Sequence, residues 1–350
     1  MGLPKSSGLD LHSKWPAGRL NKITDVPGVR VANVTVQDKD INTGVTAILP
    51  CAGNMFRNKL MAGCSVINGF GKSVGLMQIQ ELGQLETPII MTNTLSVGTA
   101  TTALTKYMLG QNPDIGVDTG TVNCVVTECN DGRLNDIRGL HITEEHVFDA
   151  LDKAEKSGTD FEEGSVGGGT GMCCLGFKGG IGSSSRTVKL DGSDYTIGAV
   201  VMSNFGSAGN LVIGGRHIGA EIEEERRRRL ASEMKRDRGS IIMIIGTDIP
   251  MTSRQLGRVS RRAAISLGRT GSYMANGSGD IALAFTTANK LPHYSDRKIL
   301  GLSMMYEDAT DDVFEASIEA VEESIVSALY HAETVRGVRN SVYYGMREFL

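Results

Sequence analysis

Long apolar runs are missing from this chain of 350 residues. None is long enough to cross a membrane, and the first stretch, "MGLPKSSGLDLHSKWP", lacks the apolar centre that a secretory signal needs. A strong net charge is also missing, because the formal charge is only -4. We therefore expect a cytoplasmic protein whose partners are neither membranes nor nucleic acids.

Metal-binding and disulfide signatures are missing as well. The six cysteines contain no C-x-x-C pair, and the six histidines form no H-E-x-x-H sequence. His141 and His146 do not have the spacing of one helical face. We expect no metal and no cofactor, and we interpret the cysteines as small buried residues in a reducing compartment.

Glycine, by contrast, is abundant, with 44 residues spread through apolar stretches. This distribution predicts tight turns and close backbone approaches. Segments with the spacing of strands and of helices are mixed without strict βαβ alternation, which favours a layered α+β sandwich over a doubly wound sheet. The chain shows no internal repeat and no linker, so we predict one structural domain, 1–350.

Several segments have clear periodicity. Those predicted to be strands are "ITDVPGVRVANVTV", "TGVTAILP", "CSVINGFG", "TPIIMTNT", "YTIGAVVMSN", "IIMIIGTD" and "DIALAFTTAN". Those predicted to be helices are "VGTATTALTKYMLGQ", "TEEHVFDALDKAEKSG", "TSRQLGRVSRRAAISLGRTG" and "DVFEASIEAVEESIVSALYHAETV". Thr252 and Gln255 have the spacing of a capping box at the start of the third helix.

A sharp border lies between Gly239 and Ser240, where a charged segment gives way to an apolar strand. Glutamates directly precede the basic run 226–229, so the two signs cancel and the pattern indicates a solvated segment rather than a nucleic-acid site. Ser240 itself has two interpretations. It is the small first residue of a strand, or it is an N-terminal nucleophile that is released when the preceding peptide bond is cut.

The second interpretation has a chemical basis. A serine hydroxyl is a weak nucleophile unless a base lies beside it. Cleavage before Ser240 would convert its own α-amino group into that base, with an ordinary pKa of about 7.7–8.0 that suits general base catalysis. Gly239 suits the cut, because a residue without a side chain allows an unusual backbone conformation there.

Other polar segments also have plain structural interpretations. "GSVGGGTGM", 164–172, resembles a phosphate loop but lacks the Gly-Lys-Ser/Thr ending, so a backbone-lined pocket wall is the better interpretation. "NGSGD", 276–280, and Asn204 at a strand end have the composition of turns. The acidic residues of "TECNDGRLNDI" are Glu128, Asp131 and Asp136, and such a pattern is usually a polar loop.

Several long strings occur here in a characteristic order. They are "ITDVPGVRVANVTV", "TGVTAILP", "GLMQIQELGQLETPIIMTNTLSVGTA", "ECNDGRLNDIRGLHIT", "GSVGGGTGMCCLGFKGGIGSSSR", "MSNFG", "RGSIIMIIGTDIPM" and "NGSGDIALAF". Together they resemble the DmpA family of self-processing aminopeptidases, which includes the L-aminopeptidase D-amidase/esterases and the β-peptidyl aminopeptidases. The resemblance covers most of the chain, and the extreme termini and 220–237 contribute little to it.

The resemblance implies a fold and a maturation step. The implied fold is a four-layer αββα sandwich, similar to the N-terminal-nucleophile hydrolases but with different connectivity. The implied step is self-cleavage before a Ser or Thr, here between Gly239 and Ser240. The products would be an α chain, 1–239, and a β chain, 240–350, which would stay together and assemble into a homo-oligomer.

The resemblance also assigns roles to residues. It implies that Ser240 is the nucleophile and that Asn204 donates to the oxyanion. Ser278 and Asp280 would orient Ser240 and carry protons, and some relatives have Glu at the position of Asp280. Glu128 would bind the free amine of a small peptide or amide substrate. Some relatives have an active-site tyrosine near the position of Asn130, so their substrate preference is not carried over to this chain.

Two other functions stay open. One is an acyltransferase of the ornithine-acetyltransferase type, in which an amine rather than water accepts the acyl group. Those enzymes generally use Thr as the nucleophile, whereas this chain has Ser240. The other is an uncleaved binding protein that keeps only the fold. We expect instead an aminopeptidase or amidase that forms an acyl-enzyme on Ser240.

Overall fold

The computed structural model describes residues 9–156, 159–222, 225 and 239–350. In these ranges the strands form two large sheets, with four strands in the order β1-β2-β5-β6 and six in the order β4-β3-β12-β11-β10-β9. The four-stranded sheet contains β1 (Arg30–Asp38), β2 (Ile41–Leu49), β5 (Ile89–Asn93) and β6 (Val125–Cys129). The six-stranded sheet contains β3 (Asn58–Gly69), β4 (Gln84–Leu85), β9 (Gly180–Leu190), β10 (Ser193–Asn204), β11 (Ser240–Thr247) and β12 (Gly279–Pro292).

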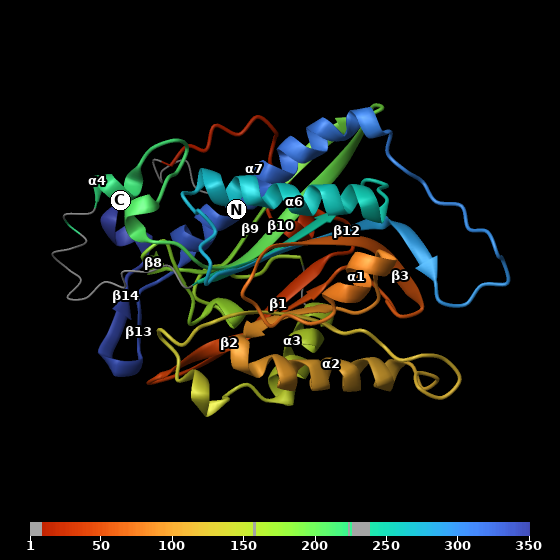
Figure 1. Ribbon diagram of the computed structural model, residues 1–350, viewed down its shortest axis with the longest axis horizontal. Coiled ribbons are helices and arrows are strands. Elements are labelled where there is room, and N and C mark those ends of the chain that lie inside the picture. Colours follow the sequence, from red (N-terminus) through yellow and green to blue (C-terminus); the bar gives the residue numbers. More distant parts are fainter. Residues whose placement is uncertain (1–8, 157–158, 223–224, 226–238) are drawn as a thin grey trace.

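Helices cover the outer face of each sheet (Figure 1). The four-stranded sheet packs against α2 (Val97–Gln111) and α3 (Glu144–Lys156), and the six-stranded sheet packs against α6 (Ser253–Arg269) and α7 (Thr310–His331). A separate apolar core lies between the two sheets. The protein is therefore a four-layer αββα sandwich, as predicted.

Shorter elements complete the fold. They are α1 (Leu76–Leu82), α4 (Ile218–Glu221), β7 (Cys173–Cys174), β8 (Phe177–Lys178), β13 (Val335–Gly337) and β14 (Ser341–Tyr343). Short 3-10 helices lie at Ile23–Asp25, Thr94–Ser96, Ile137–Gly139, Gly167–Gly169, Ala208–Asn210, Glu307–Ala309, Val338–Asn340 and Met346–Phe349.

Strand β11 shows why the central run is apolar throughout. Its residues are all buried, because the strand has β10 and β12 on its two sides and a layer of structure on each face. Ile241 and Met243 point into the core beneath α6 and α7. Ile242 and Ile244 alternate with them and point into the core between the sheets.

The strands and helices predicted from periodicity are all present, except that the first predicted strand is shorter than expected. Its first residues, Ile23–Asp25, form a 3-10 helix, and β1 begins only at Arg30. The capping box of α6 is confirmed. Thr252 Oγ1 accepts a hydrogen bond from the Gln255 backbone N–H, and Gln255 Oε1 accepts one from the Thr252 N–H at 3.0 Å. The predicted charged segment lies largely outside the described residues. None of the described helices is long and apolar enough to cross a bilayer.

The glycine-rich segment 164–172 lies between the two sheets. A Cβ added to Gly168 would be 2.9 Å from Met202 Sδ on β10 and 2.9 Å from the Met91 carbonyl oxygen on β5. Real Cβ atoms do not approach other atoms this closely, so position 168 has no space for a side chain. The backbone of this segment therefore lies in direct contact with both sheets. The close approach that we predicted is present, but its partners are two sheets rather than the contents of a pocket.

The cysteines are free, and most are buried. Burial raises the pKa of Cys64 to about 11 and that of Cys173 to about 12, so both are neutral thiols at physiological pH. This agrees with their interpretation as small packing residues. The cytoplasmic location stays a prediction.

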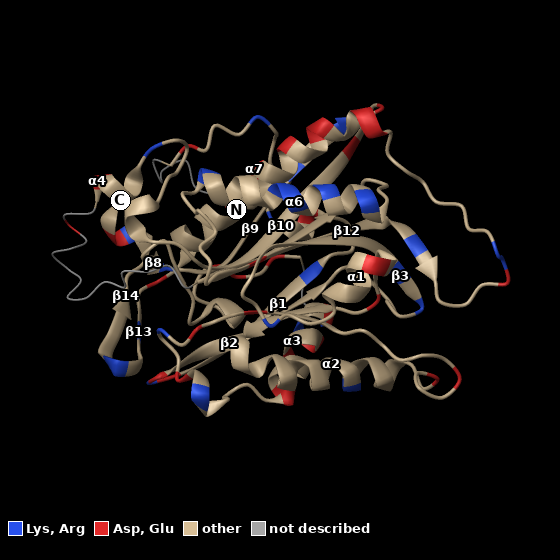
Figure 2. Ribbon diagram, viewed as in Figure 1, with Lys and Arg blue, Asp and Glu red and all other residues tan. Residues whose placement is uncertain are grey.

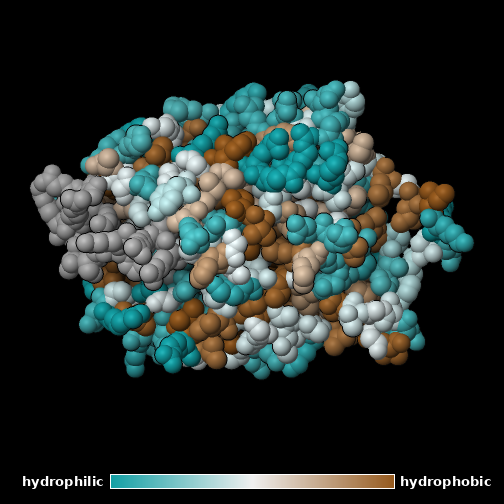
Figure 3. Space-filling model, viewed as in Figure 1, coloured by the Kyte–Doolittle hydropathy of each residue, from teal (hydrophilic) through white to brown (hydrophobic). Residues whose placement is uncertain are grey.

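Basic side chains gather on α6 and acidic ones at the start of α7 (Figure 2). Arg269 of α6 pairs with Glu322 of α7 at 2.9 Å, and Figure 3 shows the hydrophilic surface over α6. The helices α6 and α7 are therefore joined both by the apolar core beneath them and by this ion pair.

Candidate active site

The predicted nucleophile lies where three strand ends meet. Strands β11 and β12 run parallel and begin at Ser240 and Gly279, which are paired in the register of the sheet. Strand β10 runs antiparallel to β11 and ends at Asn204, which is paired with Ser240. The sheet thus places Ser240 between the predicted oxyanion donor and the "NGSGD" turn.

Ser240 is only 5% exposed. Its Oγ accepts a hydrogen bond from the Gly279 backbone N–H at 3.1 Å. A donor in this position stabilises negative charge on the oxygen, which favours an attacking hydroxyl. The backbone of the turn therefore contacts the nucleophile directly.

Ser278 and Asp280 are both buried beside this contact. The Ser278 hydroxyl donates to Asp280 Oδ1 at 2.5 Å. Such a bond to a carboxylate is stronger than one between neutral groups, so it fixes both side chains of the turn. The predicted orienting pair is assembled in the folded chain, on either side of the glycine that holds Ser240.

Sequence reasoning missed Asn68, the residue whose side chain holds the turn 276–280 in place. The Asn68 side chain donates to the carbonyl oxygens of Ala275, at 3.0 Å, and of Ser278. Asn68 lies at a bulge in the pairing of β3 with β12, next to Asp280. Bulges often re-aim side chains near active sites, but the letters around Asn68 carry no signal that reveals the bulge.

Asn204 is held at both ends of its amide. Its Oδ1 accepts the Cys173 backbone N–H at 2.9 Å, and its Nδ2 donates to the Asn130 carbonyl oxygen at 3.0 Å. A backbone N–H can only donate and a carbonyl can only accept, so the orientation of the amide is fixed. Nδ2 carries a second hydrogen, which can be donated to an oxyanion.

Glu128 comes from β6, in the other sheet, and is only 2% exposed. Oε1 accepts the Lys72 backbone N–H at 2.7 Å, and Oε2 accepts the Thr94 hydroxyl. No Lys, Arg or His of the described ranges forms a salt bridge with it. A buried carboxylate is costly without a cation, so Glu128 is well placed to receive one from a ligand.

Glu128 and the first residue of β12, Gly279, face the same small space. A Cβ on Gly71 would lie 3.5 Å from Glu128 Oε1 and 3.7 Å from the Gly279 Cα. Because Gly279 contacts Ser240, the predicted amine-binding carboxylate lies across a narrow gap from the predicted nucleophile. Two sheets therefore contribute to one site.

Asn130 contributes through its backbone. Its carbonyl accepts a hydrogen bond from the Asn204 side-chain amide. Its own side chain is exposed and accepts a hydrogen bond from the Gly132 N–H at 2.9 Å in a local turn.

The two aspartates that follow Asn130 differ from each other. Burial raises the pKa of Asp131 to about 7. Asp136 is exposed and lies 3.1 Å from His141, as expected of a polar loop.

Gly239 is required for a reason that we did not predict. We expected an unusual backbone conformation, and that expectation stays a prediction. In addition, a Cβ there would be 1.9 Å from the Asn204 carbonyl oxygen and 2.5 Å from the Phe205 Cα. Glycine is needed because the end of β10 leaves no space for a side chain.

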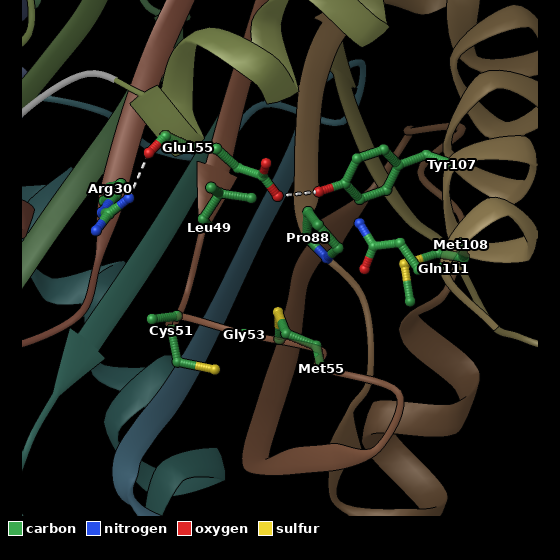
Figure 4. Close-up of a pocket in the computed structure, with 11 residues that line it drawn as sticks. Arg30, Leu49, Cys51, Gly53, Met55, Pro88, Tyr107, Met108, Gln111 and Glu155 are labelled. Carbon is green, nitrogen blue, oxygen red and sulfur yellow. Dashed lines mark hydrogen bonds between the residues drawn. The ribbon is translucent and has the colours of Figure 1, made fainter.

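A clear surface pocket lies elsewhere (Figure 4). It has a volume of about 230 Å³, and its lining includes Arg30, Leu49 and Pro88. These residues lie at the end of the four-stranded sheet opposite Glu128. None of the predicted site residues lines this pocket, so it is not the site assembled around Ser240.

Among the described residues, no group of His, Cys, Asp and Glu has the arrangement of a metal site.

The sequence profile of peptidase family S58 matches residues 21–343. The β-peptidyl aminopeptidase BapA of Sphingosinicella microcystinivorans is 36% identical over 353 residues, which cover 96% of this chain and 87% of that protein. The match therefore extends over nearly the whole chain, including both sheets and the three strand ends at the site.

Solved structures give the same result. The PH0078 protein of Pyrococcus horikoshii is 47% identical, with a TM-score of 0.91 over 99% of this chain and 97% of that one. The L-aminopeptidase D-Ala-esterase/amidase of Ochrobactrum anthropi is 34% identical, with a TM-score of 0.89 over 98% and 95%. The latter is described as a prototype of the serine aminopeptidases and a variant of the Ntn hydrolase fold.

Proposed function

This chain belongs to peptidase family S58 and is an aminopeptidase or amidase, and we propose that Ser240 is its nucleophile. The observation that carries the proposal is the position of Ser240 at the start of β11, with Gly279 donating to its Oγ and Asn204 paired beside it. This arrangement supplies a nucleophile and a neighbouring donor at one strand edge.

The nucleophile is generated by self-cleavage, which is characteristic of the family. Ser240 Oγ attacks the Gly239 carbonyl carbon and the peptide nitrogen leaves, so the amide becomes an ester. This step already frees the amine of Ser240. Water then hydrolyses the ester, which releases the Gly239 carboxylate and restores the Ser240 hydroxyl. Strand β11 stays bonded to both β10 and β12, so the chains 1–239 and 240–350 remain one folded unit.

Catalysis repeats this chemistry on a substrate. The free amine of Ser240 takes the hydroxyl proton while Oγ attacks the substrate carbonyl. Asn204 donates to the oxyanion that forms, and Ser278 and Asp280 keep the turn around Ser240 in place. The leaving amine takes up the proton, and water hydrolyses the acyl-enzyme.

Glu128 selects substrates with a free amino terminus. It is buried and lies across a narrow gap from Gly279, where an ammonium group would supply the cation that it lacks among its described neighbours. The substrate class is therefore short peptides, amides or esters with a free amine.

Mass spectrometry of the purified protein tests the self-cleavage. We expect two fragments, one of which begins at Ser240, together with release of aniline from aminoacyl anilides. Ser240→Ala should remain full length and inactive, because the attacking oxygen is gone. Ser193→Ala, at the exposed start of β10, should be cleaved and active.

A cleaved or active Ser240→Ala protein would contradict the proposed nucleophile. An acyltransferase is distinguished by adding an acceptor amine to the same donor. Transfer in place of hydrolysis would favour that alternative, whereas the family and the aminopeptidases that resemble this chain favour hydrolysis.

A further inference from the structure

A short segment links the two halves of the site. At one end the Phe70 backbone N–H donates to the Ser278 carbonyl at 3.1 Å, and at the other the Lys72 N–H donates to Glu128 Oε1 at 2.7 Å. One residue, Gly71, separates the two contacts. The segment therefore sets the distance between the turn that holds Ser240 and the carboxylate of Glu128.

Gly71 has no structural need to be glycine. Its φ lies outside the left-handed region, and an added Cβ would be 3.4 Å from Ile281 Cδ1, 3.5 Å from Glu128 Oε1 and 3.7 Å from the Gly279 Cα. These are ordinary contact distances. An alanine would fit without moving its neighbours, and its methyl group would occupy the gap between Glu128 and the start of β12, whose Gly279 contacts Ser240.

This gap is where the carbon chain of a substrate would lie. If the ammonium group binds Glu128 and the carbonyl carbon meets Ser240 Oγ, one carbon atom separates them in an α-aminoacyl group and two in a β-aminoacyl group. The methyl group of an alanine at position 71 has about the size of that second carbon. The residue at position 71 therefore influences whether an α-aminoacyl or a β-aminoacyl group fits in the gap.

We propose that Gly71 is a specificity-determining residue, and that its missing side chain leaves room for the second backbone carbon of β-aminoacyl substrates. This inference rests on the proposed roles of Ser240 and Glu128. The physical reason is the size of the gap at Gly71, which an added methyl group would fill.

The test compares kcat/KM for β-alanyl and L-alanyl para-nitroanilide. In Gly71→Ala we expect the ratio of β-alanyl to L-alanyl activity to fall by about 10-fold or more, since one methylene in a tight pocket changes discrimination by roughly 10–200-fold. Gly69→Ala is the matched control. Its Cβ would meet only Val66 Cγ1, at 3.5 Å, so the ratio should not change.

Ile281→Val provides a second variant that acts in the opposite direction. It removes the Cδ1 atom on the far side of the same gap, so the ratio should rise. This result decides the question even if Gly71→Ala fails to produce the fragment that begins at Ser240.

The outcomes separate this inference from the proposed function. If the unaltered enzyme cleaves neither anilide, the proposed function fails. If it cleaves only L-alanyl anilide, or if the ratio is the same in the unaltered enzyme and in the Gly71 and Ile281 variants, the aminopeptidase stands and the role of Gly71 is wrong.

Discussion

Single residues of this site act through neighbours that the sequence does not reveal. Asn204 can serve as a donor because a backbone N–H and a carbonyl fix its amide. Ser240 is held by the backbone of Gly279 rather than by a side chain. Residue identity therefore indicates the chemistry, while the orientation that makes the chemistry work depends on the backbone of other strands.

Glu128 offers a sharp test at this scale. In Glu128→Gln the negative charge is lost while the size is kept, so a free-amine substrate loses its ion pair. We expect kcat/KM for L-alanyl anilide to fall about 30-fold or more, consistent with roughly 2–5 kcal/mol for one partner of a buried charge pair. Self-cleavage needs no amine ligand and should continue.

The control for this variant is Glu81→Gln, which removes an exposed carboxylate on α1. Its activity should match that of the unaltered enzyme. Equal activity of Glu128→Gln and Glu81→Gln would mean that Glu128 does not bind the substrate amine.

At the scale of elements, buried polar side chains join the strands to their covering helix. β9 was not among the predicted strands, because its "SSSR" run has neither alternation nor apolar character. In the structure these serines are buried and bonded. Ser183 Oγ donates to the Ala199 carbonyl at 2.6 Å and Ser184 Oγ to the Ala320 carbonyl at 2.6 Å, which joins β9 to β10 and to α7.

Glu163 makes a similar connection, with a consequence for pH. It accepts the Ser183 N–H of β9 at 2.7 Å and the Ser327 hydroxyl of α7 at 2.6 Å. Burial raises its pKa to about 7, although the Ser327 bond and Lys22, at 3.9 Å, oppose the rise. Between about pH 4.5 and 7 the folded protein therefore keeps a proton that the unfolded chain has released.

This predicts that stability falls as pH rises. The contribution of Glu163 is present in full below about pH 4.5 and is lost as pH rises through about 7. Its size is about 3 kcal/mol at most, from the shift in pKa. Asp131 acts in the same direction.

Urea denaturation at several pH values measures this effect. Glu163→Gln should lose less stability than the unaltered protein between about pH 5 and 8. Glu162→Gln, which changes the exposed neighbouring acid, should keep the original slope. A slope in Glu163→Gln as steep as that of the unaltered protein would show that Glu163 is not the group responsible.

At the scale of the whole molecule, an apolar arm extends beyond the sandwich. The chain from the end of β12 to α7 projects at the right of Figure 1. Ile299 is 87% exposed and Met304 is 57% exposed, and Leu300, Leu302 and Tyr306 are exposed as well. Such a cluster typically marks an interaction surface, and we propose that the homo-oligomer implied by the family resemblance forms through this arm.

Light scattering after size-exclusion chromatography tests the assembly. We expect a mass that is a multiple of the 37.4 kDa chain, and a smaller mass for the double variant Ile299→Ser and Leu302→Ser. Lys298→Ser, a change beside the same position, should leave the mass unaltered. A single-chain mass for the unaltered protein would refute the homo-oligomer, and an unchanged mass for the double variant would remove the arm from the interface.

The sequence by itself determined the α+β class, the nucleophile candidate and the family resemblance, which in turn implied the four layers. Apolar periodicity and capping are local properties of neighbouring residues, so β11 and α6 were both predicted from them. The border at Gly239 and Ser240 was also visible, because it is a change of composition within one segment. The candidate site residues found from the sequence are therefore those whose own side chains have the functional groups that the reaction needs.

Only the tertiary structure decided how these residues meet. The site depends on a bulge beside Asn68, on the missing side chain of the glycine at position 71 and on the backbone N–H of Cys173. None of these features produces a recognisable pattern in the sequence. The structure also added a reason for glycine at position 239, because a side chain there would clash with Asn204, which is distant in sequence. Contacts of this kind depend on the packing of two sheets, which local sequence does not specify.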